Sequence, residues 1–317
     1  MDIDYLLWLQ GVRQSLGSGV ESLLCLITTL GMPQYLLIVV ATVYYCIDRR
    51  VGARILASFC LGSFVNEFLK ILFCVYRPFV RDTRLHVADA AASGAIGYSF
   101  PSGHAALAAG TFGSLARSYR KRRPVVVACV VAVVLIVFSR NYLGCHTPQD
   151  VVVGVAVGYG AAVVVDRAFG WVGACEWRDV RILLCCLAAS VVALSVAMLK
   201  PYPIDYDAAG NVLYDPMQAI PVVFYAAGAF DAMALGLVLE RRLVGFEDTS
   251  SWARRLLRLV PGIVLMFLLL ALGMKLGSVV GTLAGYFAIG FLPVFSIAFL
   301  WPLAFVHIEK ALPGGKG

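Results

Sequence analysis

Residues 124–150 read PVVVACVVAVVLIVFSRNYLGCHTPQD, an uninterrupted apolar run followed at once by a polar segment. The run from Val125 to Phe138 is fourteen residues long and carries no charge. As a helix rising about 1.5 Å per residue it covers roughly 21 Å, less than the ~30 Å hydrocarbon layer of a bilayer. This stretch therefore predicts a membrane-spanning helix whose polar end, beginning with Ser139 and Arg140, lies below the membrane surface.

The composition of the whole chain points to the same environment. Of its 317 residues, 61% are hydrophobic and 14% are charged, whereas a soluble domain usually carries about 25% charged residues. Apolar stretches recur along the whole length, so the bilayer and not one water-excluding core sets the organisation. The composition excludes a soluble, collagen-like, disordered or coiled-coil protein and predicts an all-α, polytopic integral membrane helical bundle.

About nine spans are predicted where apolar runs are punctuated by polar residues. They are placed at 33–47, 52–73, 101–116, 124–138, 149–165, 182–199, 219–239, 259–274 and 281–306. Residues 1–32 precede these spans, and their apolar stretch from Tyr5 to Leu30 is broken by glycines. We expect this amino-terminal segment to lie in the membrane interface or to re-enter the membrane.

The basic residues sort between the two faces that these spans define. Eighteen of the 26 Lys and Arg residues fall at one set of alternate span ends. Because Lys and Arg concentrate on the cytoplasmic side, this face and the carboxyl terminus are predicted to be cytoplasmic, and the amino terminus extracytoplasmic. The same distribution accounts for the net charge of +7 without a nucleic-acid partner. We expect the protein to reside in the plasma membrane.

Three polar segments lie at span ends on the predicted outer face, where positive charge is disfavoured. In chain order they contain Lys70 with Arg77-Pro78, then Pro101-Ser102-Gly103-His104, then Ser139-Arg140 with His146 and Asp150. Together they offer fixed cations, imidazoles and a carboxylate, which suit an oxyanion site with acid–base groups. The last two segments also open helices, whose unpaired N–H groups bind phosphate. The predicted phosphate-binding residues are Lys70, Arg77, Ser102, Gly103 and Arg140.

The spacing of His146 and Asp150 predicts a nucleophile. Four residues separate them, so they lie on one side of the first helical turn if the helix begins near Thr147. The carboxylate then holds one ring nitrogen of His146 and leaves the other free to attack phosphorus. His104 is predicted to protonate the departing oxygen and then to activate water. The catalytic residues are therefore expected to be His146, His104 and Asp150.

No metal or other cofactor is expected. A zinc site built on the two histidines needs further ligands, and Asp150 is the only one that the segments offer. The nine cysteines are odd in number and lie mostly within apolar runs, so they are interpreted as small apolar residues. The alternative is one disulfide on an oxidising side that uses Cys74 or Cys145.

At its three polar segments the chain resembles the type-2 phosphatidic-acid phosphatase superfamily, which includes membrane lipid phosphatases, glucose-6-phosphatase and the vanadium haloperoxidases. The resemblance covers about residues 50–166 and implies a phosphohistidine intermediate on His146, with Asp150 as its partner. It also implies a six-helix core. We therefore expect a phosphatase core at 33–200, followed at 201–317 by an outer loop and a membrane extension of three spans.

The expected function is metal-independent hydrolysis of a phosphomonoester or pyrophosphate of a lipid at the extracytoplasmic face. The short third and fourth spans favour a lipid substrate, because they let a lipid phosphate enter the pocket sideways within the outer leaflet. Two alternatives stay open. One is a phosphatase of a soluble sugar phosphate, in line with the nine spans of glucose-6-phosphatase. The other is a non-catalytic transporter or binding protein for phosphate esters. The sequence carries no prediction of oligomeric state.

Three further features lie around or beyond the polar segments. Glu67 precedes Lys70 by one helical turn and is expected to pair with it. Asp231 lies inside a predicted span, where a carboxylate is costly, without an evident partner. Glycines repeat at four-residue spacing at 277, 281 and 285, which is expected to give close packing between helices of this chain.

Overall fold

The computed structural model describes residues 2–88, 91, 97–173, 175, 177–207, 209–280 and 283–311. In this part of the chain the regular structure is helical, apart from one isolated β-bridge between Tyr206 and Val212. The all-α prediction is therefore confirmed. The elements are α1 (Asp2–Leu16), α2 (Ser18–Leu30), α3 (Pro33–Cys46), α4 (Arg49–Phe73), α5 (Pro78–Arg81), α7 (Gly103–Ser118), α8 (Arg123–Tyr142), α9 (Pro148–Val172), α10 (Arg178–Leu199), η1 (Pro216–Gln218), α11 (Ile220–Leu239), the π-helix η2 (Glu240–Val244), α12 (Trp252–Val280), α13 (Leu283–Phe295), the π-helix η3 (Ser296–Leu300) and α14 (Trp301–Ala311).

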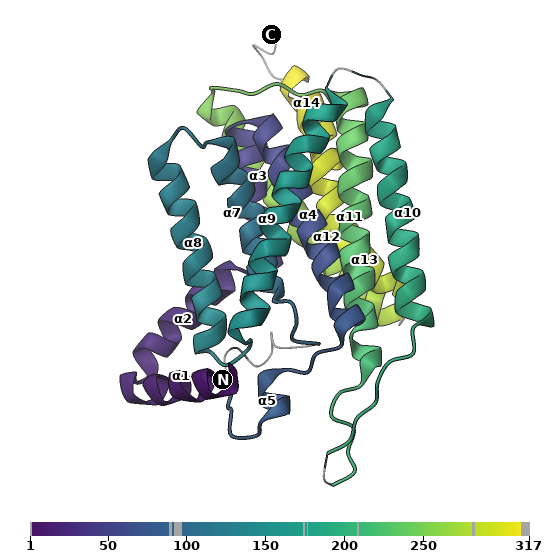
Figure 1. The fold of residues 1–317 in the computed structure, drawn as a ribbon. Coiled ribbons are helices and arrows are strands. Elements are labelled where there is room, and N and C mark those ends of the chain that lie inside the picture. Colours follow the sequence, from purple (N-terminus) through teal and green to yellow (C-terminus); the bar gives the residue numbers. More distant parts are fainter. Residues whose placement is uncertain are drawn as a thin grey trace.

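The long helices run side by side and give the bundle two ends (Figure 1). The amino terminus, α5 and the connection from α10 to α11 lie at one end, and α14 reaches the other. At the first end α1 lies across the bundle, and α2 leads back from it to α3 with a bend of 55° between them. The predicted interfacial or re-entrant segment is thus a pair of helices packed at the end of the bundle.

Seven stretches of the described chain are long and apolar enough to cross a membrane. They are Arg49–Arg81, Arg123–Tyr142, Pro148–Val172, Arg178–Leu199, Pro216–Val244, Trp252–Ser278 and Leu283–Ala311. Two predicted spans coincide with α3 and α7, which have 14 and 16 residues and do not qualify alone. Taken as one bent span, α2 and α3 give an eighth. Each predicted span coincides with a helix, but the count of about nine is not confirmed.

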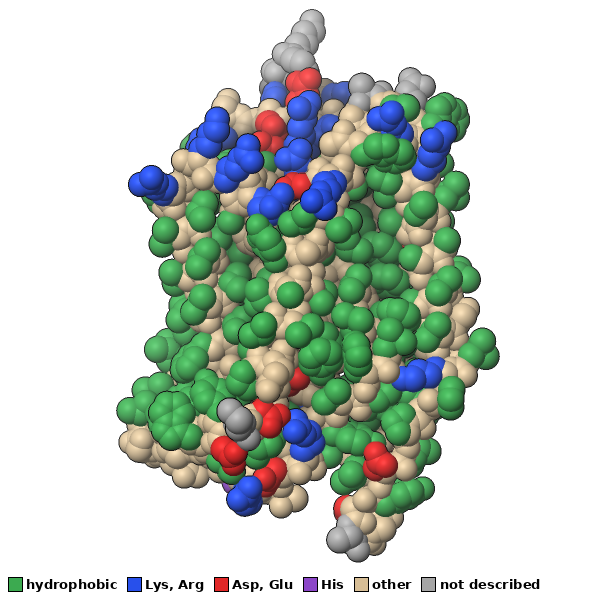
Figure 2. All heavy atoms as spheres, viewed as in Figure 1, with side chains coloured by type: hydrophobic (Ala, Val, Ile, Leu, Met, Phe, Trp, Pro, Cys, Tyr) green, Lys and Arg blue, Asp and Glu red, His purple; other side chains and the backbone are tan. Residues whose placement is uncertain are grey.

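Apolar side chains cover the middle of the bundle surface. Figure 2 shows a broad hydrophobic zone, with Lys and Arg gathered mainly at the end that α14 reaches. On α8, Val127, Val130 and Val134 are exposed, and on α10 so are Val191 and Val192. Exposed aliphatic side chains at this density suit contact with lipid tails and not with water.

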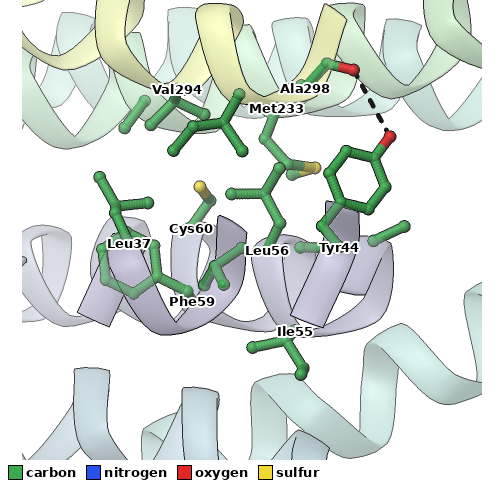
Figure 3. Close-up of a cluster of buried hydrophobic side chains, with 14 of the residues drawn as sticks. Leu37, Tyr44, Ile55, Leu56, Phe59, Cys60, Met233, Val294 and Ala298 are labelled. Carbon is green, nitrogen blue, oxygen red and sulfur yellow. Dashed lines mark hydrogen bonds between the residues drawn. The ribbon is translucent and has the colours of Figure 1, made fainter. Parts of the chain in front are cut away.

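One hydrophobic core joins the amino-terminal half to the carboxyl-terminal helices (Figure 3). The buried side chains in it include Leu37 and Tyr44 of α3, Leu56 and Cys60 of α4, Met233 of α11 and Val294 of α13. The hydroxyl of Tyr44 donates a hydrogen bond to the carbonyl oxygen of Ala298 at 3.5 Å. The carboxyl-terminal helices therefore pack directly against α3 and α4.

Close packing through glycines sets α7 beside α9. A Cβ atom on Gly158 of α9 would overlap the carbonyl oxygen of Ala106, and one on Gly154 would lie 2.6 Å from the carbonyl oxygen of Ser102. Such contacts are possible only without a side chain. They bring the first turns of α7 and α9 together, which matters because both turns carry predicted site residues.

Two of the further sequence features have partners in the structure. A Cβ atom on Gly285 of α13 would overlap the backbone of Gly277 in α12, so the predicted close packing is confirmed for this pair. Gly281 lies outside the described residues. Asp231, for which the sequence suggested no partner, accepts a hydrogen bond from the hydroxyl of Ser190 in α10 at 2.6 Å.

All nine cysteines are free, so the alternative of a disulfide from Cys74 or Cys145 is wrong. The interpretation as buried apolar residues holds only in part. Three cysteines are buried, whereas Cys175 and Cys185 are exposed. The apolar pattern could not separate these classes, since a side chain facing lipid and one facing the protein interior are equally apolar.

Candidate active site

The eight predicted site residues come together at the end of the bundle that holds the amino terminus (Figure 1). They are Lys70 near the end of α4, Arg77 before α5, Ser102, Gly103 and His104 at the start of α7, Arg140 at the end of α8, His146 in the connection from α8 to α9, and Asp150 in the first turn of α9. The backbone N–H of Ser102 donates to the carbonyl oxygen of Asp150 at 2.9 Å, which ties the two helix starts together.

The two ring nitrogens of His146 face different partners. Nε2 lies 2.8 Å from Nη1 of Arg77. Nδ1 lies 3.4 Å from Oδ2 of Asp150 and 3.5 Å from Oγ of Ser99. A guanidinium can only donate, so Nε2 is the acceptor and the ring proton of neutral His146 resides on Nδ1, facing the carboxylate. This is the tautomer whose free electron pair is on Nε2, the nitrogen that the sequence analysis expected to attack.

Asp150 is fixed by the local helix start. Thr147 is the N-cap of α9, Pro148 occupies the first turn, and Thr147 and Asp150 form a reciprocal capping box. Oδ2 of Asp150 accepts from the backbone N–H of Thr147 at 2.8 Å. It also accepts from the hydroxyl of Ser99 at 2.6 Å. These two bonds hold the carboxylate where Nδ1 of His146 meets it.

Arg77 is almost fully buried and tied to the loops around it. Its Nε donates to the carbonyl oxygen of Gly97 and its Nη1 to that of Cys145, each at 3.0 Å. The exposed fraction of the residue is 4%. A buried guanidinium in this position places positive charge directly against the reactive nitrogen of His146.

Arg140 has one edge of its guanidinium without a partner among the described residues. The residue is 1% exposed, and its Nη1 donates to the hydroxyl of Thr28 at 2.8 Å. Its Nε and Nη2 are buried without a hydrogen-bond partner in the described part of the chain. These two atoms form the fork with which arginine binds two oxygens of a phosphate or carboxylate. A buried guanidinium edge with two N–H donors and no partner is suited to bind an oxyanion.

Lys70 faces the start of α7. Its Nζ is 2.9 Å from Oε1 of Glu67, which confirms the predicted pair. The side-chain nitrogen of Asn66 donates to the same carboxylate oxygen at 3.1 Å. A Cβ atom on Gly103 would lie 3.5 Å from Nζ of Lys70. The lysine ammonium thus lies beside the α7 backbone, where helix N–H groups also favour an anion.

The first turn of α7 contributes two buried groups that lack partners within the described residues. Ser102 is the N-cap, but its side chain makes no capping bond and its hydroxyl is unpaired. Nε2 of His104 is unpaired as well. Pro101 precedes the cap of α7, whereas Pro148 occupies the first helical position of α9.

The cations dominate the electrostatics of the site. His104 lies within electrostatic range of His146, Arg140, Lys70 and Arg77. His146 is in the connection between two helices, and burial together with the nearby charges of Arg77, Arg140 and Lys70 holds its pKa well below the ordinary value. The imidazole is therefore neutral at neutral pH, as a nucleophile must be.

A small cavity opens beside Lys70. It is lined by Glu67, Lys70, Ile71, Gly97, Tyr98, Ala219 and Val222. Ala219 and Val222 belong to the turn and helix that begin the carboxyl-terminal extension. The extension therefore borders Lys70, one of the predicted phosphate-binding residues.

Three residues at the site were missed by sequence reasoning. Ser99 stands two residues before Pro101, so its polarity at the edge of a polar segment was an available signal. Asn141 follows Arg140, and its side-chain nitrogen donates to the carbonyl oxygen of His146 at 2.9 Å. Thr28 lies in an apolar segment 112 residues from Arg140, and nothing local marks it.

No group of three or more His, Cys, Asp or Glu side chains in the described ranges is arranged to hold a metal ion. The donor set at the site consists mainly of cations and imidazoles, which favours an anion over a metal. The arrangement can bind a phosphate group, present a nitrogen nucleophile to it and hold a second imidazole nearby.

Comparison with known proteins gives three matches. The family described as the PAP2 superfamily matches residues 52–174. The PAP2 superfamily phosphatase transmembrane extension matches residues 224–312. An undecaprenyl-diphosphatase of Sulfolobus acidocaldarius is 26% identical over 110 residues, which are 35% of this chain and 51% of the relative.

The chain thus spans about half the length of this curated relative. No solved structure matches it. The first family match contains every predicted site residue from Lys70 to Asp150, and the second covers the helices from α11 to α14. The chain therefore belongs to the type-2 phosphatidic-acid phosphatase superfamily and also matches that superfamily's phosphatase transmembrane extension.

Proposed function

We propose that this protein is a metal-independent membrane phosphatase that hydrolyses a phosphomonoester or pyrophosphate of a lipid through a phosphohistidine on His146. The observation that carries the proposal is the pairing of the His146 ring, with Nδ1 towards Asp150 and Nε2 towards the donor Arg77. A non-catalytic phosphate binder needs the cations but has no use for a carboxylate that fixes the tautomer of a buried imidazole.

In the proposed reaction the substrate phosphate occupies the fork of Arg140, the ammonium of Lys70 and the start of α7. Arg77 then donates to a phosphate oxygen and releases the Nε2 electron pair of His146. Nε2 forms a bond to phosphorus as the bond from phosphorus to the leaving oxygen breaks, and His104 gives that oxygen a proton. Asp150 balances the positive charge that develops on the ring.

The second step regenerates the enzyme. A water oxygen attacks the phosphohistidine, and His104 takes a proton from that water. The bond between phosphorus and Nε2 breaks, and inorganic phosphate leaves. His104 thus ends the cycle with the proton that it held while the anionic phosphate was bound, and His146 is neutral again. Both steps use only groups present in this chain, which supports the proposal that no metal takes part.

The lipid substrate and the orientation belong to the proposal. The apolar surface of α8, which ends at Arg140, supports entry of a lipid phosphate from the membrane. The archaeal relative is named for undecaprenyl diphosphate, so a polyprenyl diphosphate is the first substrate to test. Concentration of Lys and Arg at the end of the bundle away from the site supports an extracytoplasmic active site in the plasma membrane (Figure 2).

The test is phosphate release by the purified protein, in buffer containing EDTA, from a panel of lipid and sugar phosphates. We expect lipid diphosphates or monophosphates to be hydrolysed with much higher kcat/KM than glucose 6-phosphate. Preference for the sugar would favour the alternative, and binding without turnover would favour a transporter. The same assay on sealed right-side-out vesicles checks the orientation, since only an outward-facing site reaches an added impermeant ester.

The depressed pKa of His146 gives a prediction for its titration. An ordinary histidine is half protonated near pH ~6.5. Because the folded-state pKa is lowered, His146 should stay neutral as the pH falls through this value. Nitrogen-15 NMR of histidine-labelled protein should show it, with the His146 signals assigned by their loss in the alanine variant. A His146 ring that is already charged at pH 6.5 would contradict the electrostatic account.

A further inference from the structure

Both matched family regions leave out the amino-terminal helices α1, α2 and α3. These helices nevertheless reach the reactive end of the bundle. The hydroxyl of Thr28 in α2 accepts from Nη1 of Arg140, and a Cβ atom on Gly31 would lie 3.2 Å from the ring of His104. The junction between α2 and α3 therefore touches a phosphate-binding residue and a predicted acid–base residue.

The contact with Thr28 decides which part of the guanidinium is left open. Arginine has five N–H donors in a fixed plane. Thr28 engages Nη1, and the Nε and Nη2 atoms remain buried without partners in the described chain. The remaining edge carries two parallel N–H bonds that match two oxygens of a phosphate. A different rotation of the side chain would present another edge or turn this one away from the site.

Thr28 is itself held in place from several sides. It is 4% exposed. Leu24 of the same helix packs in a buried cluster with Leu143 and Cys145. Cys145 directly precedes His146 in the chain. The chain also bends by 55° just after Thr28, between α2 and α3. The hydroxyl is thus a rigid partner and not a mobile surface group.

Helix α1, which precedes α2, holds this arrangement against the loops of the site. The side-chain amide of Gln10 accepts from the backbone N–H of His86 at 2.7 Å and donates to the carbonyl oxygen of Arg84 at 3.0 Å. The buried Arg13 donates to the carbonyl oxygens of His86 and Tyr142. Because Tyr142 follows Arg140 by two residues, α1 is anchored to the same end of α8 that Thr28 contacts.

We propose that Thr28 is a positioning residue for phosphate binding: by holding Nη1 of Arg140, it sets the Nε–Nη2 edge of that arginine to receive two phosphate oxygens. The proposal rests on the phosphatase function proposed above. It assigns to the amino-terminal helices, which lie outside the matched family regions, a direct part in building the substrate site.

The test compares three variants of neighbouring threonines. Thr28→Val keeps the shape and removes the hydroxyl, whereas Thr28→Ser keeps the hydroxyl. Thr29→Val is the matched control, because the Thr29 hydroxyl donates within its own helix to the carbonyl oxygen of Cys25. For each variant KM, kcat and the inhibition constant of orthovanadate, an analogue of the five-coordinate phosphorus, are measured on the best substrate of the panel.

We expect Thr28→Val to raise KM and the vanadate inhibition constant by roughly tenfold to a hundredfold, the range for a lost hydrogen bond to a charged group. Thr28→Ser should stay within about threefold of the parent, and Thr29→Val should match the parent. A purely structural role would instead lower the active fraction, and hence kcat, in both valine variants while KM and vanadate inhibition stayed unchanged.

A double-mutant cycle with Arg140→Ala makes the assignment specific. If Thr28 acts through Arg140, Thr28→Val should cause little further loss of kcat/KM once the guanidinium is gone. The positioning role would be overturned if the losses of kcat/KM from the two substitutions multiplied in the double variant. It would also be overturned if vanadate inhibited Thr28→Val as strongly as the parent. In either case an active parent enzyme leaves the proposed function standing, whereas a parent that turns over no substrate in the panel refutes the proposed function itself.

Discussion

Replacing His146 by alanine is expected to abolish phosphate release, with a loss in kcat of roughly ten-thousandfold or more, as for removal of the catalytic group that forms or activates a covalent bond in other enzymes. The variant deletes the nitrogen that forms the bond to phosphorus. Arg140 and Lys70 remain, so the phosphate should still bind. Phosphate release from the best lipid substrate measures the first effect, and equilibrium binding of vanadate or of a labelled substrate measures the second.

The chain offers a matched control in His307. This histidine is exposed on α14, at the other end of the bundle, and its ring bonds to the carbonyl oxygen of Leu303 within the same helix. His307→Ala should retain full turnover. A radiolabelled phosphate trapped by acid-free denaturation should label the parent protein and His307→Ala but not His146→Ala. Turnover of His146→Ala within tenfold of the parent would refute the proposed nucleophile.

The local part of the site could be predicted from sequence because it depends on one helical turn. The spacing of Thr147, Pro148 and Asp150 specifies a helix start, and a carboxylate three residues after a threonine cap closes a capping box. This box fixes Asp150 on the side of His146. The predicted pair of Glu67 and Lys70 was confirmed for the same reason, since residues three apart on a helix are neighbours.

Contacts between distant segments could not be predicted in this way. Ser99 and Thr28 reach Asp150 and Arg140 only because α7, α9 and the amino-terminal helices pack together. Hydropathy also failed to show which helices are central. The most hydrophobic windows of α10 and of the stretch containing α11 have mean hydropathies of 2.7 and 1.9, yet they are 17% and 61% buried. In a bilayer the solvent is as apolar as the core, so apolarity does not reveal which face is inside.

The span count was not confirmed for a related reason. Helices α3 and α7 have 14 and 16 residues, and neither alone reaches the length of a typical span. Helix α7 begins with predicted site residues, and α3 begins beside the site. At both places the chain changes between helix and loop before the end of the bundle. Counting apolar runs treats such short helices like full spans. The positions of the helices could therefore be predicted from apolar runs, but not how many of them are full spans.

Replacing Asp150 by asparagine is the second large expected effect, with a loss in kcat of about ten-thousandfold, as when the orienting aspartate of a catalytic histidine is replaced by asparagine. The substituted amide has one oxygen and one NH₂ group. Its oxygen should keep the bonds from the backbone N–H of Thr147 and the hydroxyl of Ser99, which preserves the start of α9. The same Oδ2 position lies 3.4 Å from Nδ1 of His146, so the ring can keep its Nδ1 proton there, but the negative charge opposite it is lost.

This change removes the negative charge beside the ring without removing a single ring atom. The positive charge that develops on His146 when Nε2 bonds to phosphorus is then no longer balanced. Ser99→Ala provides the comparison, because it removes the hydroxyl that donates to Asp150 and lies 3.5 Å from Nδ1 of His146, but leaves the negative charge of the carboxylate intact. Its loss in kcat should be only about tenfold. Comparable kcat for Asp150→Asn and Ser99→Ala, each with a thermal unfolding midpoint near that of the parent, would show that catalysis by His146 does not need the negative charge of Asp150.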